Sequence, residues 1–221
     1  MYHYQHFFKN YKEGRDYEVY CRRVQGAAFA VISPHGGGIE PGTTEVSRAV
    51  AGADNNFYSF VAKKYSGNEA LHLKSTRFDE PRALKILEIS EACLARHGCD
   101  DIKKFVYIGG LNEDLTLEIT EKLECAGFKV KDAPPGLAAV YSSNICNRCG
   151  SGRGVQLELS YGLRKGMFKN VDRRYGRKKV TDCFYQFVDA VRKAIGQYKR
   201  HNSESGSSSR VNCNHNYSCY H

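Results

Sequence analysis

The sequence predicts a layered α/β protein, and two observations predict this class. Short apolar runs that end in glycine alternate along the chain with segments of helical periodicity, the pattern of helices packed on a parallel or mixed sheet. Hydrophobic residues make up 41% and charged residues 26% of the 221 residues. This ordinary balance allows one domain to bury a core and excludes a disordered, collagen-like or coiled-coil chain.

The first elements alternate between apolar runs and a short helix. A buried strand is expected at 27–33, where the run AAFAVIS stops at a proline and a series of glycines,. A helix is expected at 43–52, because hydroxyl residues can cap its start and a glycine can end it,. The alternating segments 57–63 and 71–75 are typical of strands,.

The middle of the chain contains one ambiguous segment between clearer ones. A helix follows the turn-like sequence FDEP and should end before Ala92. The segment 92–98, ACLARHG, fits either more helix or a strand that runs into a loop. A clearer strand is expected at 105–110, where FVYIGG runs into a glycine turn. From Asp114 onward the apolar residues recur on one helical face, and Gly127 ends that helix,.

The last part of the chain contains one strand, one helix and a tail. Alternation in GVQLELS predicts a strand at 154–160, and an apolar stripe predicts a helix at 181–196,. Residues 201–221 are rich in serine and lack an aliphatic stripe, which predicts a flexible tail,. We therefore expect a single α/β domain at 1–200 followed by this tail.

The chain is basic, with a net charge of +9 at pH 7 and a pI near 9.1. Such a field attracts polyanions, whether nucleic acid, anionic lipid or an acidic polymer. No apolar run approaches the roughly 18 residues that cross a bilayer, and the N-terminal residues lack the apolar core of a signal peptide,. We therefore expect a cytoplasmic protein without a membrane partner.

Nine cysteines in a chain without a signal peptide predict reduced thiols in a reducing compartment,. Cys146 and Cys149 form a CxxC pair, which is found in structural metal sites and in redox pairs. No second CxxC accompanies it, and Cys213 and Cys219 have the wrong spacing,. We interpret the pair as two thiols.

The strongest chemical signal is the segment SPHGGGIEPGTTE. His35 and Glu40 lie five positions apart at the end of a predicted buried strand, and the glycines between them allow both side chains to turn toward one point,. Imidazole and carboxylate are ligands of catalytic zinc, which needs a third protein ligand. The alternative is a glycine-rich turn with a capping glutamate and a solvated histidine.

His97 is the candidate for the third ligand, because RHG repeats the strand-end context of His35. His72 lies inside a predicted strand and is interpreted as structural. The remaining histidines lie in the terminal segments and are poor candidates: His3, His6, His201, His215 and His221.

Hydrolysis at such a site needs a base that takes a proton from the attacking water. Glu158 is the candidate, since it lies between two leucines in a predicted strand, and burial would raise its pKa and suit it to carry a proton,. The alternative is that its face of the strand is exposed to solvent.

Several blocks of the sequence, taken in order, resemble one family. ISPHGGGIEPGTTE, LHLKSTRFDEPRAL, RHG, FVYIGG, NICNRCGSGRGVQLELS and GLR are similar to the zinc-dependent poly-γ-glutamate hydrolases of bacteriophages and their bacterial relatives. The resemblance runs from Asp16 to Ile195. It implies a three-layer αβα fold with a mixed central sheet, like that of the zinc carboxypeptidases.

The resemblance also implies a reaction and its residues. Members of the family hydrolyse the γ-amide bonds of poly-γ-glutamate, the polymer of bacterial capsules and slimes. His35, Glu40 and His97 match the ligands of one Zn²⁺, and Glu158 matches the general base. The phage members of the family imply an enzyme that cell lysis releases.

A polymer with a free carboxylate on every unit calls for guanidinium and amide donors. Our candidates for substrate binding are Asn144, Arg148, Arg164 and Arg82, with Arg77 as a further one. We expect an arginine to stabilise the oxyanion and the protein to be a monomer. The alternative is that these arginines are ordinary surface residues.

Two other functions stay open. An enzyme of the same fold could act on a small N-acyl amino acid, which a closed apolar pocket rather than an open basic groove would favour. A non-enzymatic nucleic-acid binder could use the basic segment 168–179, FKNVDRRYGRKK,. No recognised nucleic-acid motif accompanies that segment. We do not expect nucleic acid to be the partner, because a basic segment does not explain the set of His35, Glu40, His97 and Glu158.

Overall fold

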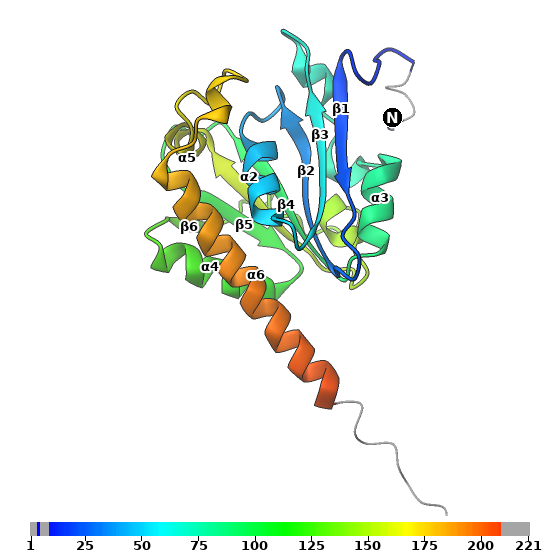
Figure 1. The fold of residues 1–221 in the computed structure, drawn as a ribbon, viewed down its shortest axis with the longest axis vertical. Helices are drawn as coiled ribbons and strands as arrows, with labels where there is room; N and C mark the ends of the chain where they lie inside the picture. Colours follow the sequence, from blue (N-terminus) through cyan, green and yellow to red (C-terminus); the bar gives the residue numbers. More distant parts are fainter. Residues whose placement is uncertain (1–3, 5–8, 209–221) are drawn as a thin grey trace, which may run out of the picture.

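The computed structural model describes residue 4 and residues 9–208, and a seven-stranded sheet forms their centre (Figure 1). The strand order is β1-β3-β2-β4-β7-β5-β6. Parallel pairs join β2 to β3 and β4, β4 to β7, and β5 to β6, whereas the β1–β3 and β5–β7 pairs are antiparallel. The strands are β1 Tyr17–Arg22, β2 Phe29–Gly37, β3 Asn56–Ala62, β4 Ala92–Cys99, β5 Val106–Gly110, β6 Val130–Asp132 and β7 Val155–Ser160.

Helices cover both faces of the sheet. Four of them, α2, α4, α5 and α6, pack on one face, and α3 packs on the other together with the short helix η3. The helices are α2 Thr43–Ala51, α3 Pro81–Glu88, α4 Glu113–Cys125, α5 Tyr161–Met167 and α6 Asp182–Ser208, with 3-10 helices η1 Asn68–Leu71, η2 Ser75–Arg77, η3 Ile145–Arg148 and η4 Gly176–Lys178. The prediction of a three-layer α/β fold with a mixed sheet is confirmed.

Strand β2 shows why the sheet needs cover on both faces. Its residues are buried along its whole length. Phe29 and Val31 pack in the cluster under α2 and α6, whereas Ala30 and Ile32 pack in the cluster under α3. A continuous apolar run rather than a polar alternation is typical of such a central strand.

One predicted element is wrong, and the structure resolves the ambiguity of another. The segment 71–75 is not a strand: Leu71 ends η1 and Ser75 begins η2. Its alternation arises because Leu71 and Leu73 are both buried in the α3-side cluster. The ambiguous segment 92–98 is a strand, β4. The short elements β1, β6 and α5 were not predicted.

The C-terminal helix is longer than its predicted range of 181–196. Helix α6 continues through Ser208 into the segment expected as a tail, and residues 209–221 lie outside the described residues. The seven cysteines in the described ranges are free thiols. Within the same ranges, no helix combines the length and apolarity that crossing a membrane requires.

One charged side chain is enclosed in the core on the α6 side. Arg96 of β4 is fully buried, with its guanidinium carbon 5.9 Å from the ring centroid of Phe187. None of its three side-chain nitrogens has a hydrogen-bond partner among the described residues. Burial lowers the pKa of Arg96 to about 9.

Candidate active site

The loop after β2 brings His35 and Glu40 together. The pairing of β2 with β3 shifts its register between Ser33 and Gly36, and such an irregularity re-aims side chains at a strand end. A Cβ at Gly36 would lie 2.0 Å from Oγ1 of Thr44, so a larger residue does not fit here. The Glu40 N–H then donates to the His35 carbonyl oxygen at 2.9 Å, which returns Glu40 to the histidine.

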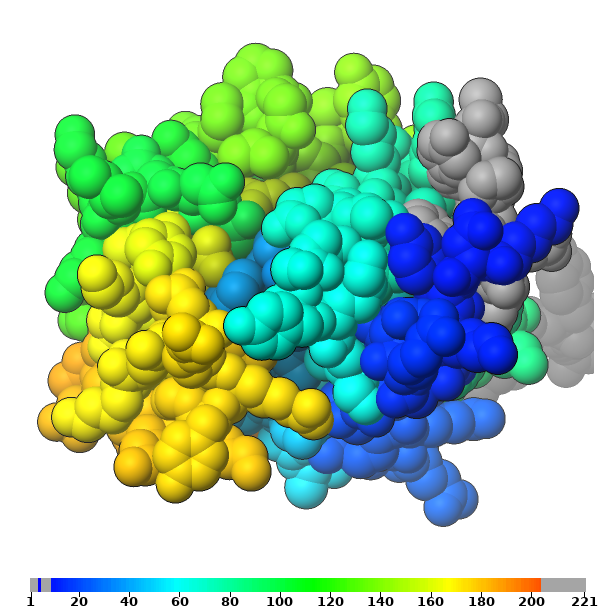
Figure 2. Space-filling view, turned by 90° about the horizontal axis from the view of Figure 1, so that it is seen from above, coloured from blue at the N-terminus to red at the C-terminus, as the bar shows by residue number. Residues whose placement is uncertain are grey.

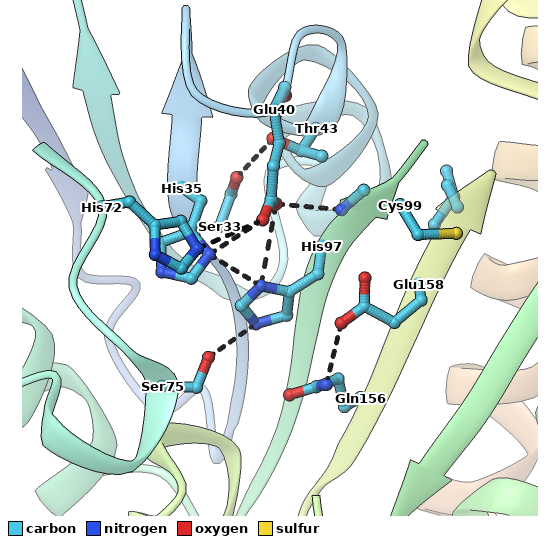
Figure 3. A network of polar contacts seen from close by, with 12 residues as sticks. Ser33, His35, Glu40, Thr43, His72, Ser75, His97, Cys99, Gln156 and Glu158 are labelled. Atoms are coloured by element: carbon cyan, nitrogen blue, oxygen red, sulfur yellow. Dashed lines mark hydrogen bonds and ion pairs between the residues drawn. The ribbon is translucent and has the colours of Figure 1, made fainter. Parts of the chain in front are cut away.

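His97 reaches the same point from the neighbouring strand β4. Its side chain is almost fully buried, and the N–H of the next residue, Gly98, donates to Oε2 of Glu40 at 2.9 Å. The structure therefore brings the three predicted ligands together at the carboxyl ends of parallel strands (Figure 3). This edge is where open α/β sheets place their sites.

Possible metal-ligand atoms from three side chains converge closely in this cluster. Nδ1 of His35 lies 2.9 Å from Oε1 of Glu40 and 3.0 Å from Nδ1 of His97, and the latter atom lies 3.6 Å from Oε2 of Glu40. The other ring nitrogen of His35 is 2.6 Å from the Leu73 carbonyl oxygen. A carbonyl only accepts, so Nε2 carries a proton and Nδ1 is the ring nitrogen that faces Glu40 and His97,. Ring nitrogens and a carboxylate at these distances need a cation or a proton between them.

Zinc fits this donor set. Imidazole nitrogens and a carboxylate are its usual catalytic ligands, and a backbone carbonyl on the second ring nitrogen is the usual partner that orients a ligating histidine. Burial opposes ionisation of Glu40, but the nearby charges of His35 and His97 outweigh it and hold the pKa of Glu40 well below its ordinary value. The carboxylate is therefore ionised and able to bind a cation.

His72 also lies at this cluster, which differs from its interpretation as a structural residue. Its ring centroid is 4.0 Å from that of His35, and its Nε2 is 4.0 Å from Oε1 of Glu40. His35, Glu40 and His72 can offer ligand atoms that all lie within 4.8 Å of one another. The His72 side chain is 42% exposed, whereas that of His97 is 3% exposed. The described residues thus contain two candidates for the third ligand, the buried His97 and the partly exposed His72.

Glu158 lies beside the cluster on the adjacent strand β7. It is the register partner of His97, and its side chain is buried, so the solvent-exposed alternative is wrong. Burial raises the pKa of Glu158 to about 7, against the lowering effect of nearby His97. Nε2 of Gln156 donates to Oε1 of Glu158 at 3.0 Å. We did not predict Gln156, although its place two residues before Glu158 puts both on one strand face.

These residues line one cleft, the catalytic cleft, with a volume of about 600 Å³. Asn144 lines it as predicted, and its Nδ2 donates to Oε1 of Gln156 at 3.3 Å. This chain of amides fixes the orientation of Gln156 and, through it, of Glu158. Lys74 lines the outer part of the cleft.

The predicted arginines do not line the catalytic cleft. Arg164 is buried behind it and donates to three backbone carbonyls, those of Leu159, Pro41 and Cys99. Two of these carbonyls flank the segments that carry Glu40 and His97, so Arg164 supports the site from behind. Sequence alone does not distinguish a guanidinium that binds carbonyls from one that binds substrate.

The other arginines lie farther from the site. Arg82 forms ion pairs with Glu13 and Glu80. Arg148 is exposed and donates to the Phe78 carbonyl at 3.3 Å, and Arg77 is exposed. Among the described residues, the catalytic cleft has no arginine in its lining, and Lys74 is its lysine.

A histidine and carboxylate donor set, with a buried glutamate beside it at the edge of a mixed α/β sheet, defines a zinc-dependent hydrolase as the class that fits. Comparison with known proteins shows to which family of hydrolases the chain belongs. Residues 2–190 match the model of the family described as poly-gamma-glutamate hydrolase, so the chain belongs to that family. It is therefore a hydrolase.

Individual relatives agree with this assignment. The UPF0714 protein YndL of Bacillus subtilis (strain 168) is 34% identical over 194 residues, which span 85% of this chain and 75% of that protein. A solved structure of a bacteriophage poly-gamma-glutamate hydrolase matches with a TM-score of 0.85 and 34% identity, covering 88% of this chain and 95% of that one.

A second solved structure bears on the cofactor. The zinc-free apo form of YndL matches with a TM-score of 0.80 and 32% identity, covering 86% of this chain and 94% of that one. Its description names zinc, and the present chain gathers a donor set that fits zinc at His35 and Glu40. The expectation of a zinc cofactor is thereby confirmed.

Proposed function

We propose that this protein hydrolyses the γ-glutamyl amide bonds of poly-γ-glutamate, with zinc held by His35, Glu40 and His97 and with Glu158 as the general base. The observation that carries this proposal is the convergence of the three donor side chains beside a buried carboxylate in one cleft. The family assignment supports the polymer as the substrate.

The chain's own residues supply the proton transfers. Zinc, when bound, would polarise the scissile carbonyl and acidify a water molecule. Glu158 then accepts the proton of the attacking water and delivers it to the leaving amine, and a pKa near neutrality suits a group that performs both steps,. Gln156 holds one carboxylate oxygen of Glu158 and leaves the other for the water.

The lining of the catalytic cleft favours a polar substrate. Asn144 and Lys74 are among the donors that could bind a substrate carboxylate or the developing oxyanion, together with the hydroxyl groups of the cleft,. The cleft includes exposed residues such as His72 and Tyr141, so it is open to solvent rather than a closed apolar pocket. An open cleft favours a polymer over a small N-acyl amino acid.

Substitution of the base tests the proposal. Zinc-loaded Glu158→Gln keeps the shape of the side chain and the bond from Gln156, so its zinc content should equal that of the wild type. Hydrolysis of purified poly-γ-glutamate, followed by polymer size, should slow by about 10²–10⁴-fold. Thr116→Ala, at a half-buried position of helix α4 outside the cleft, serves as the control. Full activity of Glu158→Gln would exclude Glu158 as the general base. A wild-type protein that binds zinc but does not cleave the polymer would exclude poly-γ-glutamate as the substrate.

A further inference from the structure

A second cleft, which we call the basic cleft, has a volume of about 640 Å³. Figure 2 shows the face on which it opens: the gold segment with residues 172–178 and the cyan segment with residues 61–69 lie on either side of a hollow, with blue residues between them. Three acidic residues line it, Glu45, Glu69 and Asp172. Its six basic residues are Arg48, Lys63, Lys64, Arg174, Arg177 and Lys178.

The basic cleft adjoins the catalytic cleft across two short segments. In the loop after β2, Gly38 and Pro41 line the basic cleft, whereas Glu40 lines the catalytic cleft. In the segment after β3, Glu69 lines the first and His72 the second. A chain that leaves the metal site over either segment therefore enters the basic cleft.

Two cations of the basic cleft are available to a ligand. Arg174 and Lys178 are exposed, and their side chains make no hydrogen bond or ion pair with the rest of the described chain. By contrast, Nε of Arg177 lies 2.9 Å from Oε1 of Glu45, and Lys63 pairs with Glu18. Helix α2 begins at this cleft without a side-chain cap, and its positive dipole end adds to the field,.

The catalytic cleft alone is poorly suited to hold a polyanion. Apart from the proposed metal ligands, its lining combines Lys74 with the carboxyl groups of Asp100 and Glu158. A substrate with a carboxylate on every unit meets acidic groups there once it extends beyond the metal. The excess of positive charge lies in the adjoining basic cleft. Part of it comes from the basic segment 168–179, which contributes no residue to the proposed catalytic mechanism.

We infer that the basic cleft is an extended subsite for the substrate, in which Arg174 and Lys178 bind α-carboxylates of the polymer on one side of the scissile bond. This inference rests on the proposed function for its choice of polyanion. The scissile bond then lies in the catalytic cleft, and the basic cleft binds the units of the polymer that extend beyond it. Truncation of the substrate then removes binding to the second cleft but not to the first.

The test compares two double variants of the full zinc-loaded protein. Arg174→Ala/Lys178→Ala removes the two available cations. Arg153→Ala/Lys85→Ala is the matched control, because these residues are exposed, have no side-chain hydrogen bond or ion pair to the described residues, and lie outside both clefts. KM and kcat are measured for long poly-γ-glutamate and for a short γ-glutamyl oligomer, at low and high salt, and calorimetry gives polymer affinity independently of cleavage.

The cleft variant should raise KM for the long polymer about tenfold, from two lost ion pairs. Its kcat should change little, the short oligomer should respond much less, and the salt dependence of KM should flatten. Equal effects on both substrates, an unchanged KM, or the same loss in the control would overturn the inference. If the wild type cleaves no γ-glutamyl substrate, the proposed function fails, whereas calorimetric polymer binding that requires Arg174 and Lys178 still supports the cleft. Tighter binding of an oligonucleotide than of the polymer would assign the cleft to nucleic acid instead.

Discussion

The fully buried Arg96 allows a quantitative prediction about stability. Lowering an arginine pKa from 12.5 to about 9 by burial corresponds to a cost of about 5 kcal/mol for keeping the guanidinium charged,. No side chain or carbonyl of the described residues offsets this cost by a hydrogen bond. Even a buried ion pair can often be replaced by apolar side chains of similar size with a gain in stability of about 1–4 kcal/mol.

We therefore expect Arg96→Met to raise the free energy of unfolding by about 1–4 kcal/mol. Urea unfolding at pH 7 measures this change, and the melting temperature should rise by roughly 2–4 °C per kcal/mol for a domain of this size. The exposed control Arg153→Met should stay within about 0.5 kcal/mol of the wild type,. A loss of stability in Arg96→Met would refute the reasoning, since it would show that the charged group is compensated in the folded protein.

The same substitution has a pH signature. The folded-state pKa of Arg96 is lower than its unfolded-state value, so between the two values the unfolded chain binds the additional proton. Wild-type stability therefore rises relative to Arg96→Met as the pH increases through 9. The gap between the two proteins should be full at pH 7 and smaller at pH 10. A gap that stays constant over this range would contradict a charged Arg96.

Further substitutions test the site and its supports. His97→Ala should abolish stoichiometric zinc binding, measured by metal analysis after dialysis, whereas His72→Ala, at the exposed position, should retain it; the reverse result would make His72 the third ligand. Arg164→Ala should lower the free energy of unfolding by about 3 kcal/mol, measured in urea, because three carbonyls lose a charged donor,; a change below 1 kcal/mol would show that water replaces it. Gly36→Ala should reduce both zinc content and activity, because its methyl group would collide with Thr44; unchanged zinc binding would mean that the loop relaxes.

Much of the fold follows from local periodicity. The apolar run of β2 is visible in the sequence because the strand is buried along its whole length, and α4 is visible because one of its faces is buried at helical spacing. The segment 71–75 was misassigned because two leucines packed on one side of an irregular segment imitate strand alternation. Short edge elements such as β6 carry too few residues for a period to emerge.

The candidate site also contains residues that the sequence indicates and residues that only the tertiary structure reveals. His35 and Glu40 are joined by local glycine geometry, and Glu158 by its position in a buried strand, so the sequence indicates them. Tertiary structure alone brings His72 to the cluster, through a segment without regular structure. It also turns Arg164 toward backbone carbonyls, which residue type does not reveal.

The hydrogen bond between the rings of His35 and His97 joins residues that are 62 positions apart in the sequence and lie on two different strands. A metal ion held there is a cross-link between β2 and β4, and it is present only as long as free zinc is available. Zinc that binds the folded chain and not the unfolded one adds stability in proportion to the logarithm of its free concentration. The concentration of free zinc should then govern how long the protein survives proteases as well as whether it can react. Zinc depletion would shorten the lifetime of the protein in addition to stopping the reaction.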